Sequence, residues 1–132
     1  MELIYDHPAC KIYEPADNAY IHTEWLGFSS SATFREIFEK ILSLVKEKQV
    51  SKVLFEGSKS KLASPDDQKW LIEDWTPRAV VAGYKYYSVV LPKDVFGQFS
   101  SKIVIQQTDS QNPIFSATTD NVEEAIAWLI AQ

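Results

Sequence analysis

The chain has 132 residues, the length of one domain, and a chain of this size can bury a core without disulfides or structural metals. Hydrophobic residues make up 45% of it and aromatic residues 13%, which indicates ordered globular packing and not disorder. The net charge of −5 provides no basic surface, which argues against nucleic acid as the main partner.

The N-terminal third predicts an antiparallel meander. Strands are expected at Glu2–Tyr5 and Lys11–Tyr13, on either side of a turn that contains Pro8. A further strand is expected from Tyr20 to Leu26. Its alternation places Ile21, Thr23 and Trp25 on one face, and Tyr20, His22 and Glu24 on a polar face.

An amphipathic helix is predicted from Thr33 to about Lys48. Apolar residues recur there at helical spacing, namely Phe34, Ile37, Phe38, Ile41 and Val45. Thr33 and Glu36 match a capping box, although the serines at 29–31 could start the helix a turn earlier. Glu36 and Lys40 are expected to form an ion pair on the solvated face.

The middle of the chain predicts a buried parallel strand followed by a helix. The strand is Lys52–Glu56, which comes directly after the first helix. The next helix is expected to begin at Pro65, with Ser64 as its N-cap and two aspartates in its first turn. Pro77 is expected to break or kink it, and a short helical piece should then run to Gly83.

The last third continues the alternation of strands and helices. Lys85–Leu91 and Pro113–Ser116 are predicted strands, and Asp120–Asn121 should cap a last helix. The segment Val95–Gln107 fits either a helix or a strand, and the βαβ order favours the helix. We therefore expect one α/β sandwich domain over 1–132, with about four helices on a mixed sheet that has antiparallel N-terminal strands.

The sequence contains no catalytic or metal-binding motif. It has no glycine-rich phosphate loop, no nucleophile elbow and no zinc-ligand spacing, so we expect no catalytic residue, no metal and no cofactor. Cys10 is the sole cysteine, and no apolar run is long enough to span a bilayer. We therefore expect a cytoplasmic protein without a membrane span.

Two segments are candidate sites. The first is Ser58, Lys59, Ser60 and Lys61, which follow a parallel strand where ligands often bind; they could hold an anion, although a flexible solvated loop is the favoured interpretation. The second is Trp70, Asp74, Trp75 and Arg78. These could line an apolar pocket with two polar contacts, form core packing with an Asp74–Arg78 ion pair, or anchor self-association.

The chain resembles the STAS fold of anti-sigma-factor antagonists, and most closely their uncharacterised bacterial relatives, which also resemble the lipid-binding CRAL-TRIO domain. The element order carries this resemblance, together with the segments 64–70, 74–79 and 125–129. In anti-sigma-factor antagonists a serine at the start of the helix after the central strand is phosphorylated. Ser58 is the nearest match here, but the neighbouring aspartate and glycine of that motif are absent.

These observations predict a non-enzymatic STAS-like domain that acts as a regulatory protein-interaction module and forms a homodimer. The alternative is a carrier or sensor of a small apolar, lipid-like ligand held near the helix of Trp70 and Trp75. An enzyme of an unrecognised type is the third possibility.

Overall fold

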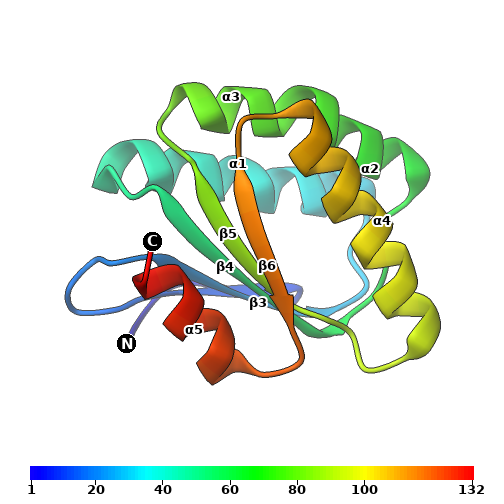
Figure 1. Cartoon of the computed structure of the whole chain (residues 1–132), viewed down its shortest axis with the longest axis horizontal. Helices are drawn as coiled ribbons and strands as arrows, with labels where there is room; N and C mark the ends of the chain where they lie inside the picture. Colours follow the sequence, from blue (N-terminus) through cyan, green and yellow to red (C-terminus); the bar gives the residue numbers. More distant parts are fainter.

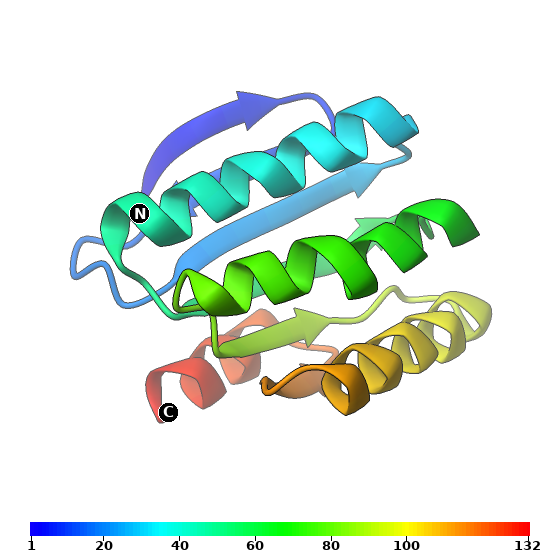
Figure 2. The same cartoon turned by 90° about the horizontal axis from the view of Figure 1, so that it is seen from above.

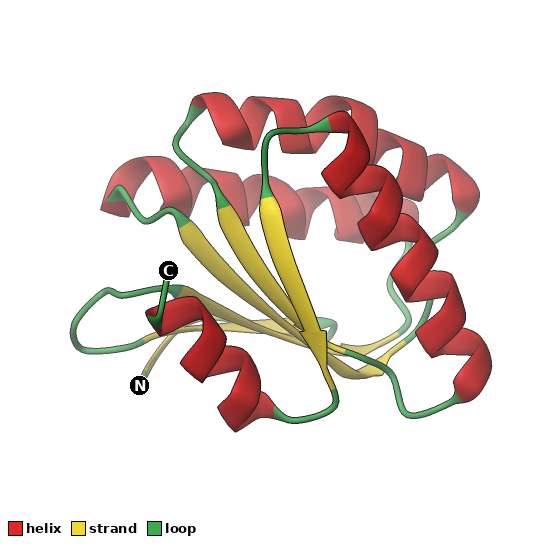
Figure 3. Cartoon of the chain, viewed as in Figure 1, coloured by secondary structure: helices red, strands yellow, loops and turns green.

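The computed structural model describes residues 1–132 and contains one six-stranded sheet whose strands lie side by side in chain order (Figures 1 and 3). The strands are β1 (Glu2–His7), β2 (Cys10–Glu14), β3 (Ile21–Gly27), β4 (Lys52–Ser60), β5 (Tyr86–Val90) and β6 (Phe115–Thr119). The first three strands pair antiparallel and the rest parallel, which confirms the predicted mixed sheet. The last strand begins two residues after the predicted start at Pro113.

Helices cover both faces of the sheet unequally. They are α1 (Ser31–Lys48), α2 (Pro65–Trp70), the π-helical turn η1 (Leu71–Trp75), α3 (Thr76–Val81), α4 (Val95–Gln111) and α5 (Val122–Ile130). Figure 2 shows α1, the continuous helix α2–η1–α3, and α4 side by side over one face, whereas α5 lies on the other. The segment that fitted either helix or strand is therefore the helix α4.

The start of α1 differs from the predicted capping box. Ser30 is the N-cap, and its side chain accepts a hydrogen bond from the Thr33 backbone N–H at 3.2 Å. The helix thus begins in the serine run, which was the alternative start. The predicted Glu36–Lys40 ion pair is wrong, because the Lys40 ammonium lies over the Tyr5 ring instead, 6.0 Å from its centroid.

Pro77 does not break the second helix, because the turn before it widens into a π-helix. The Leu71 carbonyl accepts from both the backbone N–H and the hydroxyl of Thr76, the hydroxyl at 2.7 Å. The Ile72 carbonyl accepts from the Asn112 side chain at 3.4 Å. A π-turn and an outside donor thus satisfy carbonyls near the proline, so the chain stays helical from residue 65 to residue 81.

The core lies on both faces of the sheet. The larger cluster joins β2, β3 and β4 to α1 and η1, and the smaller one places Ala125 and Leu129 of α5 against the opposite face, as predicted for the last helix. The expected polar face of β3 is also covered. His22 is buried there, and its Nε2 lies 2.9 Å from a Glu56 carboxylate oxygen.

Candidate functional site

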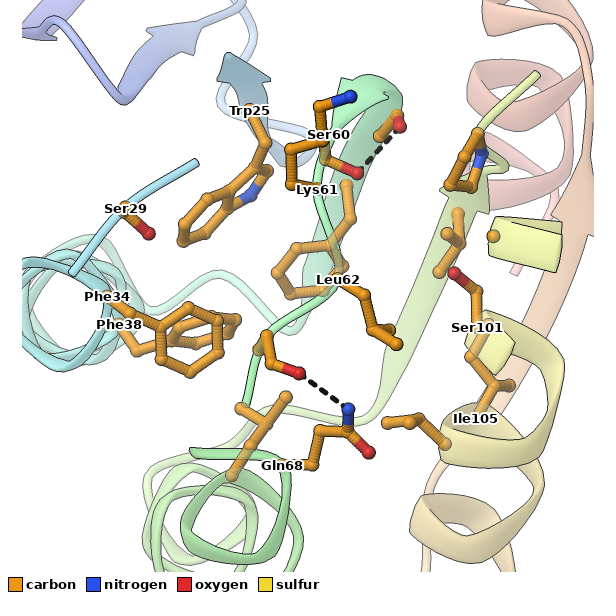
Figure 4. Close-up of a pocket in the computed structure, with 18 of the residues that line it drawn as sticks. Trp25, Ser29, Phe34, Phe38, Ser60, Lys61, Leu62, Gln68, Ser101 and Ile105 are labelled. Carbon is orange, nitrogen blue, oxygen red and sulfur yellow. Dashed lines mark hydrogen bonds between the residues drawn. The ribbon is translucent and has the colours of Figure 1, made fainter. Parts of the chain in front are cut away.

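A cavity of about 400 Å³ lies between the sheet and the helices on the face opposite α5, namely α1, α2–η1–α3 and α4. Figure 4 shows Phe34 and Phe38 from α1, Leu62 from the segment after β4, and Ile105 from α4 around the same space. Its volume is near the lower end of the range of about 300–1,000 Å³ typical of small-molecule pockets. The space therefore suits a small ligand.

Aromatic rings from several surrounding elements form much of the wall. The rings of Trp25 and Trp75 lie 5.1 Å and 4.9 Å from the ring of Phe38, and all three line the cavity. The Trp75 indole N–H also donates to the Phe38 carbonyl at 2.6 Å, which fixes its orientation. Rings that hold one another in this way make a preformed apolar wall.

The cavity is closed at one end and open at the other. Around the mouth, at the carboxyl ends of β3 and β4, Phe28 is 76% exposed and Phe96 is 74% exposed. Trp75 and Tyr84, which line the other end, are only 1% and 3% exposed. A ligand would therefore enter from the carboxyl end of the parallel strands, where open α/β sheets bind their ligands.

The cavity extends along most of α4. Its lining includes Phe96 in the first turn of this helix and Thr108 in the last. These residues are twelve positions apart, which is about 18 Å at the helical rise. A cavity of this length can hold a linear chain in an extended conformation.

Short side chains on α4 account for the empty space. Gly97, Ser101 and Thr108 face the aromatic residues of the sheet. Gly97 leaves room for the helix cap, because a Cβ there would lie 2.7 Å from the Asp94 carboxylate that caps α4. The helix therefore carries too little side-chain volume to fill the gap above the sheet.

Polar groups near the mouth are mostly bonded within the protein. The Ser60 hydroxyl donates to the Gly57 carbonyl at 2.7 Å, and the Gln68 side chain donates to the Ala63 carbonyl at 2.7 Å (Figure 4). Lys61 is exposed at the mouth and forms no ion pair. A charged end of a ligand would therefore meet water, Lys61 and the exposed Asp94 carboxylate at the mouth.

The closed end contains two tyrosines that stay protonated. Burial and a 2.6 Å hydrogen bond from its hydroxyl to Asp109 raise the pKa of Tyr87. Burial also raises the pKa of Tyr84 well above its ordinary value. Neither phenol can serve as a general base near neutral pH, and no group of three or more His, Cys, Asp or Glu side chains is placed to hold a metal.

The first predicted site segment is mostly strand. β4 continues through Ser60, with Lys59 opposite Leu26 and Ser60 opposite Gly27 of β3, so the interpretation as a solvated loop is wrong. Ser60 and Lys61 line the cavity, whereas Ser58 and Lys59 do not. Ser58 therefore lies within a strand and not at the helix start that the resemblance implies.

The second predicted site separates into a buried part and a surface part. Trp75 lines the cavity, but its burial contradicts a role as an exposed anchor of self-association. Trp70 lies outside the cavity, beneath the guanidinium groups of Arg35 and Arg78 at 5.2 Å and 5.9 Å. Arg78 forms the predicted ion pair with Asp74 at 2.8 Å and a second one with Glu39, and neither Asp74 nor Arg78 lines the cavity.

The sequence did not identify most of the cavity wall. The missed residues are Trp25, Phe34, Phe38, Tyr84, Tyr87 and the inner face of α4. One signal was available. Gly97, Ser101 and Thr108 recur at helical spacing, which places short side chains on a single face of the helix.

Comparison with known proteins shows the fold and no more. No protein-family model and no curated protein match the chain. A similar solved structure is an uncharacterised DUF3478-family protein with a SpoIIAA-like fold from Shewanella loihica PV-4. It has 12% sequence identity and a TM-score of 0.57, with 96% of this chain and 98% of that chain covered. By this structural similarity, the chain has a SpoIIAA-like, STAS-like fold. Separately, none of the helices is both long and apolar enough to cross a membrane.

Proposed function

We propose that this domain binds a small, linear, apolar molecule and acts as its carrier or sensor. The aromatic-lined cavity supports this proposal, since it runs along most of α4, is open at one end and is closed by buried rings at the other. Transfer of a ligand's apolar surface from water into such a space is favourable by about 25 cal/mol per Å². The size of the cavity favours a single hydrocarbon chain over a two-chain lipid.

Titration with the neutral fluorescent probe N-phenyl-1-naphthylamine tests the proposal. The probe should gain fluorescence on binding to the wild-type protein. Val104→Phe, which adds a ring inside the cavity, should weaken this binding at least tenfold. Ile103→Phe is the matched control, because Ile103 is adjacent on α4 but outside the cavity lining. Equal probe affinity in the two variants, or none in the wild type, would contradict the proposal.

A protein-interaction role remains the second candidate. One observation favours it: the outer side of α4 exposes Val95, Phe99 and Ile103, although a solvated helix face is normally polar. We propose that a second copy of the chain covers this stripe. Phe99→Ser should then shift a dimer toward monomer in sedimentation velocity without changing probe binding. A wild-type protein that is monomeric at every concentration would refute this role.

A further inference from the structure

Tyr84 occupies a particular position at the closed end of the cavity. It follows Gly83, whose φ of +114° lets the chain turn sharply between α3 and β5. Its backbone N–H donates to the Ala79 carbonyl at 3.0 Å, and its ring lies against Trp75 and Tyr87. The tyrosine side chain is thus held in place by both its backbone and its ring.

The hydroxyl of Tyr84 differs from the neighbouring polar groups because it forms no hydrogen bond in the protein. The hydroxyl of Tyr87 donates to Asp109, and the Trp75 indole donates to Phe38. Tyr84 has no such partner, although the residue is 3% exposed and lines the cavity. The protein does not fully enclose this hydroxyl, so it can bond to a molecule in the cavity, whereas phenylalanine would provide the same ring packing without a polar group there.

The surroundings of this hydroxyl restrict what could pair with it. Tyr84 stays protonated and so can donate a hydrogen bond. The nearby Asp109 carboxylate already accepts from Tyr87 and Ser116. A ligand carboxylate or phosphate at this end would be desolvated and repelled by Asp109, whereas a neutral oxygen would meet neither penalty.

We propose that Tyr84 is the polar anchor of the cavity and donates a hydrogen bond to a neutral oxygen on a linear hydrocarbon ligand. The inference rests on the proposed function and names its ligand class: chains with a carbonyl or hydroxyl oxygen at or near the buried end. The chain follows α4 along the cavity, and any charged group lies at the mouth near Lys61.

Displacement of N-phenyl-1-naphthylamine by three eleven-carbon competitors tests the assignment. Tyr84→Phe should weaken binding of 2-undecanone about threefold to tenfold, the usual effect of losing one neutral hydrogen bond. The same variant should leave the affinities for undecane and undecanoate unchanged, because neither places a neutral oxygen at the closed end. Tyr86→Phe is the matched control, because Tyr86 stacks on Phe115 outside the cavity and should change none of the three affinities.

The outcomes separate this inference from the proposed function. Equal loss of affinity for undecane and 2-undecanone in Tyr84→Phe would assign Tyr84 a packing role and overturn the inference alone. Unchanged affinity for 2-undecanone would also overturn only the inference. A wild-type protein that binds neither the probe nor any competitor would overturn both.

Discussion

Replacing Trp75 with alanine removes the largest fully buried side chain in the protein and enlarges the cavity it lines. The substitution also deletes the indole donor to the Phe38 carbonyl and the edge contacts with Phe38 and Tyr84. Large aromatic residues replaced by alanine in a core cost about 3–5 kcal/mol. We expect a loss of about 4 kcal/mol in the free energy of unfolding, which is a large share of the total of about 5–15 kcal/mol for a natural domain.

Urea unfolding followed by far-UV circular dichroism measures this loss. The thermal midpoint should fall as well, by about 10–20 °C for a domain of this size. Trp128→Ala is the control, because Trp128 is half-buried against Tyr86 on the opposite face and should cost much less. If Trp75→Ala kept the wild-type urea midpoint and changed the oligomeric state instead, Trp75 would be a surface anchor and the described core would be wrong.

Three further predictions concern single residues. Burial raises the pKa of Asp67, but hydrogen bonds from Ser31 and Arg35 outweigh this and hold the pKa below its ordinary value. Asp67→Asn should therefore lose stability at pH 6, and its difference from wild type should shrink as the pH falls below about 4; a constant difference in urea midpoints would argue against this linkage. Burial, followed by the nearby charge of Glu24, raises the pKa of Cys10 to about 12, so an aromatic disulfide reagent at pH 8 should label the thiol only after unfolding. Rapid labelling of the native protein would disprove that burial. Gly57→Ala should cost about 1–3 kcal/mol in thermal unfolding, because its Cβ would lie 2.9 Å from the Val90 carbonyl oxygen, and an unchanged midpoint would show that β4 and β5 separate easily.

The order and type of the helices and strands could be predicted because they depend on local sequence features, namely helix caps and hydrophobic periodicity. Ser64 accepts from the Asp67 N–H at 3.2 Å as a predicted N-cap should, and Asn121 caps α5 in the same way. Periodicity also placed α1 and the central strands. These features depend on neighbouring residues, so one sequence is enough to find them.

The errors arose where distant residues decide the outcome. Pro77 was expected to break or kink the helix because its own N–H is missing, yet the helix continues through a π-helical turn, and Asn112, the C-cap of α4, provides a donor to the Ile72 carbonyl. Ser58–Ser60 looked like a loop because of their composition, but β3 is long enough to extend the pairing to Ser60. Neither partner is visible in a local window of sequence.

The cavity was the least predictable feature for the same reason. Its wall joins Trp25, Phe38 and Trp75 from three separate elements to Tyr84 from the connection before β5, and each of these residues is typical of an ordinary core. Empty space results from the mismatch between these rings and the short side chains of α4. The helix that carries Trp70 and Trp75 does form one wall, as the ligand hypothesis expected. Of these two tryptophans, only Trp75 lines the cavity.

Chemical-shift mapping of the ¹⁵N-labelled protein with 2-undecanone tests the central claim that this cavity binds a linear apolar molecule. The indole N–H signals of Trp25 and Trp75 should shift together with backbone amides of Tyr84 and Ile105, because these residues line the cavity. The indole signal of Trp128, which belongs to α5 on the other face of the sheet, should stay in place. Shifts confined to the exposed stripe of α4, or no shifts at saturating ligand, would contradict the account.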